Sequence, residues 1–236
     1  MNIVRKQPSL SNFGSVSAAG GSFSTFQGSF DVNRASEDGK MAFRLNGLYR
    51  DTEGYRDGTE GSVGAVNPAF SWRPTSSTTV NVNYEYVDSD YDPDAGIPIA
   101  ALDRPQVDRD TSYASPFDYS EQSIHRAQVD VEHRISDRFA IRNKTFYRQL
   151  NWNTDGTLLG FVFPGGIDPS ADLVTRSLLL LDDKQDIFGN QFETTFAVAT
   201  GPVRHRLLAG LELSQYSDIY SLDVGLLPPI SLEGPF

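Results

Sequence analysis

The stretch VNVNYEYV (residues 80–87) alternates strictly between two kinds of side chain. The apolar or aromatic positions are Val80, Val82, Tyr84 and Tyr86, and the polar positions between them are Asn81, Asn83 and Glu85. Successive side chains of an extended strand point to opposite faces, so this segment has one apolar face and one polar face. The pattern predicts a half-buried β-strand.

The same period of two recurs along the chain, in residues 41–49, 124–134, 192–198 and 205–213. The polar faces are densely charged, and no segment keeps a convincing helical period. Aromatic residues stand on the apolar faces near strand ends: Phe70, Trp72, Tyr84, Tyr86 and Tyr147. We therefore expect an all-β protein. Its nine strands are predicted near residues 14–20, 25–33, 41–50, 62–73, 79–88, 121–134, 139–152, 187–199 and 204–217.

The connections between these strands differ systematically in length. After a first tight reversal, short links (35–40, 74–77, 136–138, 200–203) alternate with longer ones (51–61, 89–120, 153–187). This predicts an antiparallel up-and-down sheet with short turns at one end and long loops at the other. A soluble β-sandwich also alternates polar and apolar faces, but it has no reason to sort its loops this way. The sorting favours an incomplete outer-membrane β-barrel, in which apolar side chains face lipid and charged ones face a wet lumen.

Composition limits the remaining classes of function. The 236 residues carry a net charge of −11, which argues against binding to nucleic acid. The chain has no cysteine, and this excludes disulfides, thiolate zinc sites and cysteine nucleophiles. No run approaches the ~20 apolar residues of a membrane helix, and the N-terminus lacks the apolar core of a signal peptide.

The sequence contains no strong motif for a metal site or a catalytic site. The stretch DSDYDPDAGIP (88–98) begins like a calcium loop, but Pro93 stands where an EF-hand requires glycine, so a solvated acidic loop is expected. His125, His133 and His205 lie far apart on predicted strands, and no HExxH, GxSxG, phosphate-loop or dinucleotide motif occurs. We therefore predict no catalytic residues, no metal site and no enzyme activity.

Aromatic residues of the long loops are the candidate ligand-binding residues. They are Tyr91, Tyr113, Phe117 and Tyr119, and Phe161 and Phe163 are similarly placed. Two interpretations remain open for them. Loop aromatics either pack a loop on itself or contact an amphipathic chelate at a barrel mouth.

The start of the chain, MNIVRKQPSL (1–10), reads as the end of another unit. Asn2–Val4 predicts a short strand, which the basic pair Arg5 and Lys6 and then Pro8 would end.

Several segments resemble TonB-dependent siderophore receptors. NIVRKQPS (2–9) resembles the sequence that closes their plug domain, and GSVSAAGGSFSTFQGSFDVN (14–33) resembles their first barrel hairpin. The further matching pieces are EDGKMAFRLNGLYRD (37–51), PAFSWRPTSSTTVNVNYEY (68–86), DAGIP (94–98) and VRHRLLAGLELS (203–214). These pieces follow the family's order along nearly the whole chain.

The resemblance implies a barrel of about 22 strands in the outer membrane of a Gram-negative bacterium, plugged by an N-terminal domain. Residues 1–10 would be the end of the plug and a linker, and residues 11–236 the N-terminal part of the barrel. The implied ligand is an Fe(III)-siderophore rather than a resident cofactor. The implied partners are that ferric siderophore, the TonB complex and outer-membrane lipid, with no nucleic acid.

The chain departs from the family in having about nine strands, no signal peptide and no TonB box, so we expect a fragment that cannot transport alone. Three alternatives stay open. They are a soluble β-sandwich binding module (carbohydrate-binding or adhesin-like), a porin-like channel, and an enzyme on a β scaffold.

Overall fold

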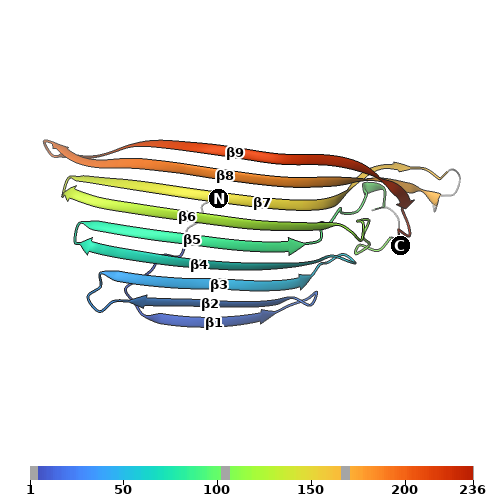
Figure 1. The fold of residues 1–236 in the computed structure, drawn as a ribbon, viewed down its shortest axis with the longest axis horizontal. Coiled ribbons are helices and arrows are strands. Elements are labelled where there is room, and N and C mark those ends of the chain that lie inside the picture. Colours follow the sequence, from blue (N-terminus) through green and yellow to red (C-terminus); the bar gives the residue numbers. More distant parts are fainter. Residues whose placement is uncertain (1–4, 102–106, 166–170, 236) are drawn as a thin grey trace.

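The computed structural model describes residues 5–101, 107–165 and 171–235. These residues form one nine-stranded antiparallel sheet whose strands lie in chain order (Figure 1). The strands are β1 (Phe13–Gly20), β2 (Phe26–Ala35), β3 (Met41–Glu53), β4 (Glu60–Thr75), β5 (Thr78–Tyr91), β6 (Tyr119–Ser136), β7 (Phe139–Phe163), β8 (Leu173–Thr200) and β9 (Val203–Ser231). A 3₁₀ turn, η1 (Ile99–Ala101), interrupts the loop before β6. The predicted all-β, up-and-down fold is confirmed.

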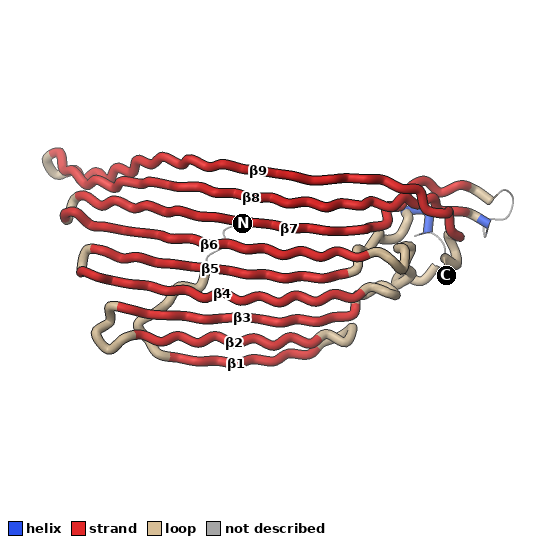
Figure 2. Tube along the Cα trace, in the orientation of Figure 1, coloured by secondary structure: helices blue, strands red, loops and turns tan. Residues whose placement is uncertain are grey.

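The sheet is open, and its two edge strands are β1 and β9. Tight turns gather at one end of the sheet and the larger connections at the other, as Figure 2 shows. A β-sandwich would divide the strands between two sheets packed face to face, whereas the described strands share one sheet. The sandwich alternative is therefore wrong.

Cross-strand register gives the sheet one apolar face. Phe43 pairs with Phe70, Phe70 with Val82, and Val82 with Val129, so apolar side chains form a row across four strands. This row is exposed: Phe43 keeps 45% of its surface accessible. A contiguous exposed apolar surface of this kind is unfavourable in water and suits contact with lipid or protein. The described residues include no helix that is long and apolar enough to span a membrane.

The longest strands run far past this apolar row. β8 has 28 residues and β9 has 29, so each extends for about 90 Å, roughly three times the thickness of a bilayer core. The predicted loop at 153–187 is wrong, because β7 and β8 stay paired from Asn153↔Asp182 out to Phe163↔Leu173. β9 likewise continues to Ser231 rather than ending near residue 217.

A small hydrophobic core lies beyond the sheet, where the loop between β5 and β6 packs against the ends of β8 and β9. Its buried members are Ala101, Val107, Tyr113, Val174 and Leu232. We call this region the loop cap. The loop before β6 is therefore folded against the long strands.

Two glycines make room for aromatic rings on the neighbouring strand. Gly189 of β8 pairs directly with Phe146 of β7, and Gly47 of β3 pairs with Phe30 of β2. A Cβ added to Gly189 would overlap the Phe146 ring, and one added to Gly47 would lie 2.8 Å from the Phe30 ring. These glycines are needed for close cross-strand packing.

We predict that Gly189→Ala destabilises the sheet by about 1–3 kcal/mol, because the Phe146 ring must leave its position. Heat-modifiable migration of the full-length gene product on SDS gels would report this as a lower melting temperature. Gly225→Ala is the control, since a Cβ there would meet Leu178 Cβ at an ordinary 3.9 Å. Equal melting temperatures for the two variants would contradict the packing role of Gly189.

Candidate functional site

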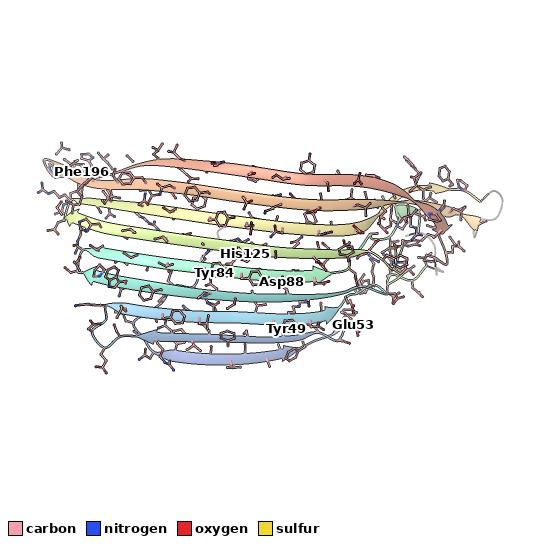
Figure 3. The ribbon with its side chains drawn as sticks, in the orientation of Figure 1. Tyr49, Glu53, Tyr84, Asp88, His125 and Phe196 are labelled. Atoms are coloured by element: carbon pink, nitrogen blue, oxygen red, sulfur yellow. The ribbon has the colours of Figure 1, made fainter. Side chains whose placement is uncertain are left out.

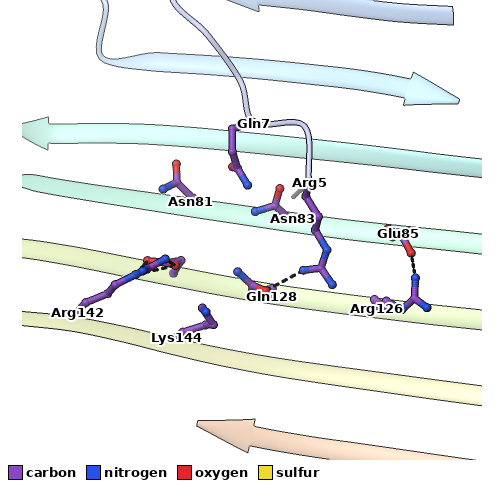
Figure 4. Close-up of a pocket in the computed structure, with 10 residues that line it drawn as sticks. Arg5, Gln7, Asn81, Asn83, Glu85, Arg126, Gln128, Arg142 and Lys144 are labelled. Atoms are coloured by element: carbon purple, nitrogen blue, oxygen red, sulfur yellow. Dashed lines mark hydrogen bonds and ion pairs between the residues drawn. The ribbon is translucent and has the colours of Figure 1, made fainter. Parts of the chain in front are cut away.

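The face opposite the apolar row carries a polar groove of about 810 Å³ (Figure 4). Strict alternation along β5, β6 and β7 turns every second side chain toward it. Its lining is Arg5, Gln7, Asn81, Asn83, Glu85, Arg126, Gln128, Asp130, Arg142 and Lys144. We call this face the inner wall.

Ion pairs on the inner wall join neighbouring strands. Arg126 of β6 pairs with Glu85 of β5, and Arg142 of β7 pairs with Asp130 of β6. Charged partners on adjacent strands fix each other's side-chain geometry and leave a wet, charged surface instead of a dry core. The inner wall is thus built to meet water or a polar domain.

The N-terminal segment 5–11 crosses the inner wall and is fastened to it. Lys6 Nζ lies 2.9 Å from Asp31 Oδ2, and Arg5 donates to Gln128 Oε1 at 2.8 Å. The fully buried Asn33 accepts from Ser9 N at 3.0 Å and donates to the carbonyls of Ser9 and Ser11 at 2.8 and 2.7 Å. The strand predicted at Asn2–Val4 lies outside the described residues.

The four candidate ligand-binding aromatics occupy different environments. Tyr91 is the last residue of β5 and Tyr119 the first of β6, so both lie in strands rather than in loops. Tyr119 donates to Asn153 Oδ1 at 2.8 Å, and Tyr91 pairs with the neighbouring Ser120. Successive residues face opposite ways, so Tyr91 and Tyr119 point to opposite faces of the sheet.

Tyr113 is fully buried in the loop cap, and its hydroxyl donates to the carbonyl of Leu232. Burial raises the pKa of this phenol. Phe117, in contrast, keeps 83% of its surface exposed. The structure therefore does not bring the four aromatics together, and a ligand role for any of them remains a prediction. Phe161 and Phe163, also taken as loop aromatics, lie in β7.

A buried arginine fastens the loop cap to the long strands. The Arg176 guanidinium of β8 donates to the carbonyl of Tyr113 at 3.2 Å and to that of Pro228 at 3.3 Å. Burial lowers the pKa of Arg176, which lies well outside the apolar row. The Arg176 side chain thus links β8, the loop before β6 and β9.

Tyrosines stand on the apolar face toward the end of the sheet that carries the larger connections; two of them, Tyr49 and Tyr84, are labelled in Figure 3. Tyr86 donates to Asp88 at 2.8 Å and stacks on His125, and the Tyr84 hydroxyl lies 2.7 Å from His125 Nδ1. Along β5, the apolar face extends for about 20 Å from Val80 to Tyr86, which is close to the height of the apolar band of a membrane barrel.

This arrangement is that of an interfacial aromatic belt, with rings in the apolar layer and hydroxyls at the aqueous side. Sequence reasoning found the aromatics but missed a spacing that was visible. Tyrosine is followed two residues later by aspartate in Tyr49/Asp51, Tyr86/Asp88 and Tyr216/Asp218, and each phenol donates to that carboxylate.

The acidic stretch 88–98 has structural roles. Asp92 Oδ2 accepts from the backbone N–H of Glu60 at 3.0 Å, and Asp94 pairs with Arg56 at 2.8 Å. Within the described ranges, no group of three or more histidine or carboxylate side chains is placed to hold a metal ion.

We predict that Asn33→Ala frees the N-terminal segment, since it removes one acceptor and two donated hydrogen bonds. Leaving those backbone groups unpaired costs about 1–3 kcal/mol. Hydrogen exchange of peptides covering residues 5–12 should become faster. Asn46→Ala, whose amide bonds to Asn67, is the control and should leave this segment unchanged. Unaltered hydrogen exchange in Asn33→Ala would refute the role of Asn33 in holding the N-terminal segment.

We also predict that Tyr113→Ala opens the loop cap, at a local cost of about 3–5 kcal/mol for a large buried ring. Limited proteolysis of residues 107–118 should then be much faster. Phe117→Ala, on an exposed side chain, should change cleavage little. Equal protease resistance of Tyr113→Ala and the wild-type protein would show that the ring does not hold the cap.

Comparison with known proteins gives relatives of one kind, although no protein-family model matches the chain. The metal-pseudopaline receptor CntO of Pseudomonas aeruginosa UCBPP-PA14 is 26% identical over 220 residues, covering 92% of this chain and 30% of the relative. The ferrichrome outer membrane transporter/phage receptor of Escherichia coli K12 is 24% identical, covering 90% and 31%. The probable TonB-dependent siderophore receptor PiuA of Acinetobacter baumannii is 24% identical, covering 91% and 30%.

The chain thus spans about a third of the length of these curated relatives. Among solved structures, the open form of the ferric-catecholate import receptor Fiu from E. coli K12 aligns with a TM-score of 0.90 and 24% identity. That alignment covers 98% of this chain and 38% of the receptor. In sequence and in fold, this chain therefore corresponds to part of the β-barrel of TonB-dependent siderophore receptors.

Proposed function

We propose that the chain forms part of the barrel wall of an outer-membrane receptor that imports ferric siderophores. The observation that carries this proposal is the two-faced sheet, which aligns over 98% of its length with a ferric-catecholate import receptor. Its outer face is apolar and edged by tyrosines, as lipid contact requires, and its inner wall is charged.

The inner wall supports a plugged receptor more than an open porin-like channel. Residues 5–9 already lie across it, held by Asp31, Asn33 and Gln128. In this proposal residues 1–10 are the end of a plug and its linker, and residues 11–236 belong to the barrel. Energy would come from the TonB complex acting on the plug, and outer-membrane lipid would surround the apolar face.

The Fe(III)-siderophore is the cargo, and the proposal needs no resident cofactor. An enzyme on a β scaffold is the weaker alternative, because the curated relatives are named as receptors and transporters. Ligand contacts at the mouth are proposed for the exposed Phe117 and for Tyr91 and Tyr119 at their strand ends, whereas the burial of Tyr113 suits a cap anchor.

Uptake of radioactive iron tests this function. We expect the full-length gene product, expressed in E. coli that lacks its own siderophore receptors, to restore uptake of at least one ferric siderophore from a panel of hydroxamates and catecholates. Deleting tonB in the same strain should abolish the gain.

Iron uptake that persists without TonB would point to a channel instead. Absence of both binding and uptake for every chelate in the panel, with the protein present in the outer membrane, would overturn the proposed function.

A further inference from the structure

Charge is sorted along the length of the sheet. We define the loop end as the described residues within 50–61, 88–122, 150–187 and 216–235. It holds 20 Asp and Glu but only 5 Lys and Arg, whereas the other described residues hold 9 and 14. The loop end of the sheet is therefore strongly negative, and the remaining described part, which includes the tight turns, has a net positive charge. Such a field attracts cations and repels anions before any contact forms.

Within the loop end, a cavity of about 770 Å³ opens between the β1–β2 turn, the β3–β4 turn and the loop before β6. We call it the loop-end bowl. Six carboxylates line it: Glu53, Asp57, Glu60, Asp92, Asp110 and Asp118. Its one lining cation, Arg56, pairs with Asp94, which is not part of the lining, and donates to the carbonyl of Arg109. The negative charge of the bowl thus stays largely uncompensated.

Asp118 is a buried carboxylate in the lining of the bowl. It is 94% buried, and its Oδ2 accepts from the backbone N–H of Thr157 at 2.7 Å. Its Oδ1 has no hydrogen-bond partner among the described residues. Arg176, the nearby cation, donates to the carbonyls of Tyr113 and Ala114. A buried carboxylate oxygen without a hydrogen-bond donor is costly, so positive charge that enters the bowl beside Asp118 is favoured.

The size of the bowl and the spacing of its carboxylates favour an organic cation over a bare metal ion, because no described group of three such side chains is close enough to ligate one. Resting on the proposed function, we propose that the loop-end bowl recognises a protonated amine on the cargo, so that the receptor selects cationic ferric chelates over neutral and anionic ones.

Two probes with identical iron coordination test this charge selection. In the ferric complex of a linear trihydroxamate, three hydroxamates balance Fe³⁺, so a free terminal amine gives a net charge of +1. Acetylating that amine gives a neutral complex of nearly the same shape. We expect the full-length gene product, purified in detergent, to bind the amine complex about tenfold more tightly. Raising the salt to 0.5 M should shrink this ratio.

Substitutions of single carboxylates test whether the preference for the amine complex arises in the bowl. Asp118→Asn should abolish most of the preference for the amine complex over the acetylated one. Asp57→Asn, on an exposed lining residue, should reduce the preference in part and covers the case in which Asp118→Asn fails to fold. Asp137→Asn makes the same charge change in the turn between β6 and β7, at the opposite end, and should have no effect.

Equal affinity for the two trihydroxamate complexes, or tighter binding of a trianionic ferric triscatecholate, would overturn charge selection and leave the proposed function standing. If both Asp118→Asn and Asp57→Asn kept the preference for the amine complex, the bowl would not be the source of the charge selection. Failure to bind any ferric chelate would overturn the proposed function and this inference together.

Discussion

Backbone pairing between neighbouring strands, in nearly unbroken register, determines everything else in this molecule. Because side chains alternate along a strand, register decides which face each one occupies, and a slip of one residue would exchange the two faces. The row from Phe43 to Val129 and the ion pair between Glu85 and Arg126 both depend on the same pairing. The few register shifts lie near strand ends, at Trp72/Thr75, Arg134/Ser136, Leu159/Val162 and Val174/Arg176.

Local pattern was sufficient to predict the strands that have one face in lipid-like surroundings and one in polar surroundings. It failed where those surroundings end. The run Leu178–Leu181 has no alternation and is followed by Asp182 and Asp183, so the strand pattern is absent there, yet the run lies within β8. Beyond the apolar row, both faces of the β7–β8 hairpin meet similar surroundings. Polar and apolar side chains therefore no longer need to alternate there. Hydrogen bonding to β7 and β9 on its two sides keeps the segment extended.

The candidate site shows the same division between local and long-range information. Nothing near Tyr113 indicates burial, because the carbonyl that accepts its hydroxyl belongs to Leu232, 119 residues later. The contact between Arg5 and Gln128 spans 123 residues. Such contacts follow from the curvature and order of the whole sheet. Composition, in contrast, already contained the excess of carboxylates, and only the fold revealed that they gather at one end.

The extension of β7, β8 and β9 also changes what this wall presents to the outside. Residues 173–187 of β8 continue for about 50 Å past the level of Phe188, as a paired and clamped hairpin instead of a disordered tether. In the proposed outer-membrane receptor, a structure of that length would rise well above the lipid headgroups. Antibodies, phages and secreted proteases would therefore meet a rigid ledge first, and its ordered backbone would resist cleavage while offering a conformational epitope.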